Sequence, residues 1–182
     1  MANLTHSETF VITNRYEAID TMSITPQKVW KGDDAAEFTS ERYSDITFQL
    51  QRKIGNGEWM PYEYSADTST VTLSADNSVV THGTVSEWNA ATWQTEDRPT
   101  TIWTNTAISG LPKFFVQNEG EGMYNMYPCY YRFVEVQAEN QSIPSGAEIF
   151  DSKTGVGEYK ITSSSVMSDT GTYSITNTFE KK

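Results

Sequence analysis

Alternation of apolar and polar residues with a period of two is the feature that most constrains this chain. It is clearest at 45–51, where Ile46, Phe48 and Leu50 are separated by polar residues. Successive side chains of a strand point to opposite faces, so this pattern is typical of a strand with one buried face. The chain also contains 24 Thr and 18 Ser, which suit strands and turns better than helices. The sequence therefore predicts an all-β protein with almost no helix.

Other segments of the same character, bounded by turn residues, predict further strands. They are 10–17, 22–31, 59–64, 70–73, 79–85, 101–106, 130–137, 158–164 and 171–179. Segments rich in Gly, Asn, Ser and Asp predict loops at 32–44, 116–126 and 138–157. The number and spacing of the strands indicate a β-sandwich.

Charge and cysteine content exclude several classes of function. Asp and Glu number 24 against 13 Lys and Arg, a net charge of −11, so the chain lacks the clustered cations that nucleic acid requires. No apolar stretch approaches the length of a membrane helix, so membrane insertion is not expected. Cys129 stands alone, and His6 and His82 fit no catalytic or metal-binding spacing. We therefore expect no metal, no cofactor and no ordinary enzyme.

One internal repeat bears on domain organisation. The segment 10–17 echoes 173–180, with apolar residues in the same phase and with Asn14 matching Asn177. Two such endings indicate tandem modules. Residues 1–18 would then be the closing strand or tail of a preceding module, and residues 19–182 would form one module. Chance similarity between short Thr-rich strands is the alternative.

Three predicted strands carry a polar residue on their apolar face. Lys28 shares its face with Met22, Ile24 and Trp30, Glu135 shares its face with Tyr131 and Phe133, and Asn177 lies between Ile175 and Phe179. Burial of a charge is costly unless the charge is paired or neutralised. We therefore expect these three side chains to meet one another or to lie at a strand edge.

Two interpretations of this trio remain open. It can be a purely structural buried Lys–Glu pair with an Asn that completes its hydrogen bonds. Alternatively, burial lowers the pKa of the Lys and raises that of the Glu, so that a proton passes between them and leaves a nucleophilic amine. That amine could attack the Asn side chain and release ammonia. The product would be an amide bond between two side chains.

Five short motifs occur in an order that resembles the Cna B-type modules of Gram-positive surface adhesins and pilins. They are Lys28-Val29-Trp30, Leu73-Ser74-Ala75-Asp76-Asn77, Leu111-Pro112-Lys113-Phe114, Tyr131-Arg132-Phe133-Val134-Glu135 and Ile175-Thr176-Asn177-Thr178. The resemblance covers roughly residues 19–182 and implies an immunoglobulin-like β-sandwich. The chain departs from the family pattern in an insertion at about 78–101, which enlarges one loop.

The resemblance also implies a function. In that family a Lys of the first strand and an Asn of the last form an intramolecular isopeptide bond, helped by a Glu. By position, Lys28 is the nucleophile, Asn177 the electrophile and Glu135 the catalytic proton shuttle. Lys31 lies on the opposite face from Lys28, and Asn14 lacks a matching Lys, so both are weaker candidates. The bond would form once, which is not enzymatic turnover.

The family resemblance further implies a place for the chain. It would be a stalk module of an extracellular, cell-wall-anchored adhesin or pilus-like protein, with export signal and anchor outside these residues. Its partners would be neighbouring modules of the same polypeptide.

The insertion supports an alternative function. Trp88, Trp93 and Trp103 have the chemistry of a ligand-binding platform, because flat indoles stack on sugar faces. Such a platform would bind a host glycan or an extracellular protein. A structural role of the three indoles, as a cap on the sandwich, is the competing interpretation.

Overall fold

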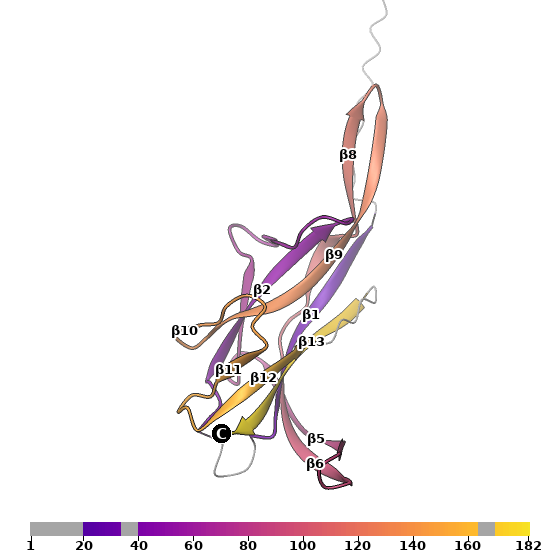
Figure 1. The fold of residues 1–182 in the computed structure, drawn as a ribbon. Coiled ribbons are helices and arrows are strands. Elements are labelled where there is room, and N and C mark those ends of the chain that lie inside the picture. The colour runs from indigo at the N-terminus through magenta and orange to yellow at the C-terminus, as the bar shows by residue number, and fades with distance from the viewer. Residues whose placement is uncertain (1–19, 34–39, 164–169) are drawn as a thin grey trace, which may run out of the picture.

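The protein is all-β in the computed structural model, which describes residues 20–33, 40–163 and 170–182. The described strands form two sheets (Figure 1), and no helix occurs among these residues. The prediction of an all-β, sandwich-like architecture is therefore confirmed. The predicted strand at 10–17, with Asn14, lies outside the described residues.

The first sheet places the beginning and the end of the described chain side by side. Its order is β11-β12-β13-β1-β6-β5, and β7 also pairs with β1. β1 and β13 run parallel, whereas the other pairs in this sheet are antiparallel. The seven strands are β1 (Thr21–Lys31), β5 (Val79–Asn89), β6 (Gln94–Thr104), β7 (Ile108–Pro112), β11 (Ile149–Asp151), β12 (Gly157–Ser163) and β13 (Thr170–Lys181).

The second sheet is built around the long pairing of β2 with β9. Its order is β10-β9-β2-β3, with β4 also on β2 and β8 also on β9. The six strands are β2 (Asp45–Ile54), β3 (Met60–Pro61), β4 (Thr70–Ser74), β8 (Phe114–Gly120), β9 (Met123–Ala138) and β10 (Gln141–Ser142). The hairpin turn between β2 and β3 contains Gly55 at a φ of 53°, a conformation that favours glycine.

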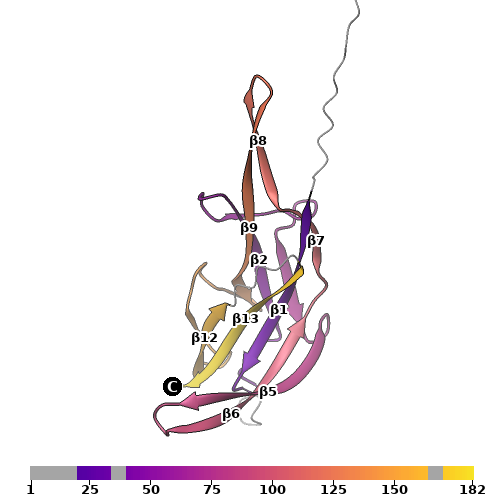
Figure 2. The same cartoon turned by 90° about the vertical axis from the view of Figure 1, so that its right-hand side faces the viewer.

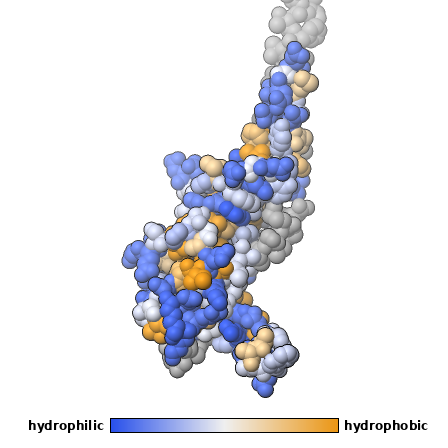
Figure 3. Space-filling model, viewed as in Figure 1, coloured by the Kyte–Doolittle hydropathy of each residue, from blue (hydrophilic) through white to orange (hydrophobic). Residues whose placement is uncertain are grey.

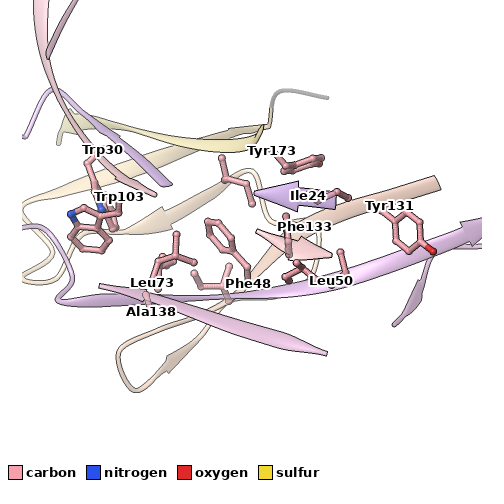
Figure 4. Close-up of a cluster of buried hydrophobic side chains, with 14 of the residues drawn as sticks. Ile24, Trp30, Phe48, Leu50, Leu73, Trp103, Tyr131, Phe133, Ala138 and Tyr173 are labelled. Carbon is pink, nitrogen blue, oxygen red and sulfur yellow. The ribbon is translucent and has the colours of Figure 1, made fainter. Parts of the chain in front are cut away.

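The core lies between the inner faces of the two sheets. Ile24 and Trp30 of the first sheet meet Phe48, Leu50 and their neighbours from the second (Figure 4). These are the residues that the period-two pattern assigns to one face of each strand. The alternation therefore positions the polar residues of the same faces inside the sandwich as well.

Two hairpins project from the sandwich at opposite ends (Figures 1 and 2). The β8 strand and the first part of β9 form one, which we call the upper arm, and β5 with β6 forms the other, the lower arm. Figure 3 shows apolar residues on the upper arm among hydrophilic ones, and Phe114 and Met126 are exposed there. The prediction of a loop at 116–126 is therefore wrong, whereas the insertion at 78–101 is itself largely hairpin.

Candidate functional site

Lys28 lies on β1 and points into the sandwich. The strand alternates strictly between buried and partly exposed residues from Met22 to Trp30, and Lys28 falls in the buried phase. Its side chain is fully buried. A lysine in this position must find a partner for its charge or lose the charge.

Asn177 lies on β13, the parallel neighbour of β1. The register pairs Lys28 with Ile175 and Trp30 with Asn177. Lys28 and Asn177 therefore belong to the same face of the sheet, one alternation step apart. Asn177 is also fully buried.

Glu135 reaches this pair from the opposite sheet. It lies on β9 in register with Phe48, where the pairing with β2 shifts by one residue. The alternation of burial changes at the same point, because Ala138 is buried and Gln137 is exposed. Such a bulge alters the direction of the strand and of its side chains. Glu135 is the last residue that points inward before it.

The three side chains form one hydrogen-bonded cluster. Glu135 Oε1 accepts a hydrogen bond from Lys28 Nζ, and Glu135 Oε2 accepts one from Asn177 Nδ2 at 3.2 Å. Asn177 Oδ1 has no hydrogen-bond partner among the described residues. A single carboxylate thus bridges an amine and the nitrogen of a side-chain amide, which is the arrangement needed to move a proton from one nitrogen to the other.

Burial changes the acidity of the amine. The pKa of Lys28 falls from its ordinary value of 10.5 to about 8, mainly because burial disfavours the charged form. The neighbouring Glu135 opposes this shift, and Asp33 opposes it more weakly. The amine is therefore easier to deprotonate than an exposed lysine, while it remains in contact with a proton acceptor.

Trp30 forms one wall of the cluster. Lys28 Nζ lies 4.6 Å from the centroid of the indole ring. Trp103 and Tyr159 pack against the same indole edge-to-face, at centroid distances of 5.4 and 5.2 Å. Lys28 Nζ is thus held between a carboxylate and an aromatic wall.

A second buried polar cluster was not anticipated from the sequence. Asp33 is fully buried and accepts hydrogen bonds from Arg42 Nε at 3.0 Å and from the Tyr159 hydroxyl at 2.8 Å. Burial, and next the charge of Asp33, raise the pKa of Tyr159. Asp33 and Arg42 lie in the predicted loop 32–44, whereas Tyr159 lies on the predicted strand 158–164, so no sequence pattern joins the three. They fix Tyr159 against Trp30.

The structure separates the three tryptophans of the predicted platform. Trp88 and Trp93 lie at the end of the lower arm and are exposed, whereas Trp103 is buried against Trp30. Trp103 belongs to the part of β6 that pairs with β1, where it lies opposite Lys28. It is therefore a core residue and cannot contribute to a surface platform with the other two.

Lys31 is placed at the base of the lower arm. Its side chain makes an ion pair with Glu87 of β5. Glu87 also faces Arg98 of β6 at 4.0 Å. Lys31 is not in contact with the cluster of Lys28.

Neither a metal site nor a membrane-spanning helix occurs among the described residues. Within residues 20–33, 40–163 and 170–182, no group of three or more His, Cys, Asp or Glu is arranged to hold a metal ion. The same residues include no helix that could cross a membrane.

Comparisons of the chain with protein-family models, with curated proteins and with solved structures found no match. Its function must therefore be argued from its own residues and their geometry.

Proposed function

We propose that Lys28 and Asn177 form an intramolecular isopeptide bond, with Glu135 as the proton shuttle. The observation that carries this proposal is the Glu135 carboxylate, whose two oxygens contact the attacking and the leaving nitrogen. A structural ion pair requires only the first contact. The second contact is to Nδ2 of Asn177, and Oδ1 of the same side chain has no hydrogen-bond partner among the described residues. This arrangement supports a reaction.

The reaction begins with a proton transfer. Lys28 Nζ gives a proton to Glu135, which leaves a neutral amine beside a carboxylic acid. The amine attacks Cγ of Asn177 and forms the new C–N bond. Glu135 then donates its proton to Nδ2 and takes the surplus proton from Nζ. The Cγ–Nδ2 bond breaks, ammonia leaves, and a neutral amide joins the two side chains.

The bond would change the mechanical properties of the domain. It would join positions 149 residues apart, and the loop-closure model for crosslinks gives a stabilisation of about 5 kcal/mol for such a span. It would also join β1 directly to β13, the strands nearest to the two ends of the described chain. Tension between those ends would be carried by covalent bonds.

We infer from this that the chain is a structural module of a surface adhesin or pilus-like stalk. The order of its motifs, the two sheets and the position of the trio support a Cna B-type, immunoglobulin-like module. Such a protein is extracellular and anchored to the cell wall, and its partners are neighbouring modules. The reaction occurs once and consumes its own side chains, so the module is not an enzyme.

Peptide mapping tests the proposed crosslink. Trypsin should release one branched peptide in which residues 16–31 are joined to residues 161–181 through Lys28 and Asn177. Lys28→Ala should abolish this peptide, whereas Lys31→Ala, a lysine of the same strand, should retain the crosslink. Two separate linear peptides from the folded, unaltered chain would contradict the proposal.

A further inference from the structure

The lower arm ends in two indoles that the fold does not use. Trp88 and Trp93 are 61% and 78% exposed, more than any other aromatic residue among those described. Their ring centroids lie 6.3 Å apart with the ring planes at 89°. Each indole could bury a large apolar area, yet both remain in water. A partner outside this chain would explain why they are there.

The tip that carries these indoles is held by a hydrogen-bond network. Asn89 Oδ1 accepts hydrogen bonds from the backbone N–H groups of Ala91 and Thr92, at 2.9 and 3.4 Å. Asn89 Nδ2 and Thr92 Oγ1 both donate to Glu96, at 2.8 and 2.9 Å. These bonds hold the pKa of Glu96 below its ordinary value. The turn is therefore fixed by four polar contacts rather than by apolar packing.

Trp93 has a backbone conformation that is unfavourable for a bulky residue. Its φ is 55°, in the left-handed region, which glycine adopts far more readily than a bulky residue does. Gly or Asn would serve the turn better. The edge-to-face contact with Trp88 can offset this cost, but it leaves both indoles exposed and available to a ligand.

The surroundings of the two indoles indicate the chemistry of the ligand. Perpendicular rings form a corner that offers the face of one indole and the edge of the other. Trp88 pairs with Thr95, and the next pair on the same face is Ser86 with Asp97, whose side chains are hydrogen-bonded at 2.5 Å. A hydroxyl and a carboxylate group therefore lie next to Trp88 on the same face of the hairpin.

A shallow hollow lies beside this corner and is also polar. Its volume is about 190 Å³, and its lining includes Glu87, Trp88, Glu96 and Arg98. Carboxylates and a guanidinium can bind several hydroxyl groups of one ligand. An apolar ligand would find few partners there.

Charge and area argue against other ligands. Between residues 86 and 98 there are three carboxylates and one arginine, which disfavours nucleic acid and anionic lipid. A stable protein interface buries about 800 Å² on each partner, whereas two indoles expose at most about 250 Å² each. Sugars present flat C–H faces to aromatic rings and hydroxyls to polar groups.

We propose that the tip of the lower arm, defined by Trp88 and Trp93, binds a neutral oligosaccharide. This site lies on an arm outside the sandwich core and does not depend on the crosslink. It would add recognition to a domain whose core serves a mechanical purpose.

The indole N–H signals in two-dimensional NMR test this site on the full chain. The probes are cellohexaose, maltohexaose and chitohexaose as neutral ligands, a heparin hexasaccharide as an anionic one, and vesicles of phosphatidylcholine. We expect saturable shifts of the Trp88 and Trp93 signals with at least one neutral oligosaccharide. Either Trp→Ala substitution at the tip should weaken that binding by at least about tenfold.

Trp59→Ala is the matched control, because Trp59 is only partly exposed and lies 4.5 Å from Arg132 on the second sheet. It should bind as the unaltered chain does. Absence of binding by all neutral probes, binding that survives the double substitution, or a response only to heparin or vesicles would overturn the proposal. So would a loss of thermal stability in the Trp88 and Trp93 variants, since the indoles would then be structural. All of these variants should still lose the mass of one ammonia through the proposed crosslink, so the two proposals can fail separately.

Discussion

The proposed reactivity of Lys28 depends on the position of its Nζ atom, which β1 buries inside the sandwich. Exposed on the surface, the same amine would stay protonated at neutral pH and would not attack an amide. Burial lowers the pKa of Lys28 to about 8, and Glu135, which contacts Lys28, can accept the proton. Asn177 is bound to the other oxygen of the same carboxylate. The sandwich thus brings the amine, the carboxylate and the side-chain amide of the proposed reaction together.

The shifted pKa predicts how stability depends on pH when the crosslink cannot form. In Asn177→Ala, the folded pKa of Lys28 remains below the ordinary 10.5 of the unfolded chain. The unfolded chain then binds more protons between pH 8 and 10.5, so the contribution of this group to stability rises with pH across that range and is lost as pH falls through it. The total effect is about 3 kcal/mol.

Urea unfolding at pH 7.5 and at pH 10.5 measures this dependence. The control is the triple variant Lys28→Met, Glu135→Gln, Asn177→Ala, in which the other titrating groups are unchanged. The free energy of unfolding of Asn177→Ala, measured relative to that of the control, should increase as pH rises. Parallel curves would show that Lys28 has an ordinary pKa in the folded state.

At the scale of the elements, alternation predicted the strands that have one buried and one exposed face. The alternation places Lys28, Glu135 and Asn177 in the interior. In the structure β1, β9 and β13 each bury one face against the opposite sheet, and all three side chains lie there. The sequence predicts a loop at 116–126 because the segment is rich in Gly and Asn. Both faces of the upper arm meet solvent, so burial leaves no period in the sequence that would indicate its strands. Gly120 and Gly122, with φ of 89° and 81°, mark only its turn.

The place of Trp103 could not be predicted for a related reason. The chain returns from the tip of the lower arm to the sandwich along β6. The first residues of this strand are largely exposed, and its last residues are largely buried. No feature of the sequence marks the residue at which that strand re-enters the sheet. The contacts of Asp33 with Arg42 and Tyr159 were missed because Asp33 and Arg42 lie in an irregular loop and Tyr159 lies on β12, far away in sequence.

The upper arm should contribute little to the stability of the sandwich. A hairpin of two strands is marginal by itself, and the outer part of this one has no third strand among the described residues. Phe115 and Tyr127 are paired across the arm, so residues 116–126 can be replaced by Asn-Gly, which favours a tight hairpin turn. The melting temperature should stay within about 3 °C of that of the unaltered chain, and the crosslink should still form. A large loss of either would mean that the arm is part of the folding unit.

At the scale of the whole molecule, the parallel pairing of β1 with β13 would decide how the domain responds to tension between its ends. Nine residue pairs connect these two strands, and pulling on the ends of the chain would shear them past each other. A covalent bond between Lys28 and Asn177 would stop this movement. The residues between the two positions would then be shielded from the force.

Single-molecule stretching measures that shielding. The unaltered chain, held by its two termini, should show no release of the 148 residues between Lys28 and Asn177 before it detaches. The Glu135→Ala variant should unfold with an added contour length of roughly 50 nm, at about 3.6 Å per residue. Equal extension of both chains would contradict the mechanical role.

The intact mass of the purified, folded protein, compared with that of the Glu135→Ala variant, tests the central claim most directly. The unaltered chain should weigh one ammonia less than its sequence requires, and the variant should have its full calculated mass, because the proton carrier is missing. A full mass in the folded, unaltered chain would contradict the account and would leave Lys28, Glu135 and Asn177 as a buried polar cluster without a reaction.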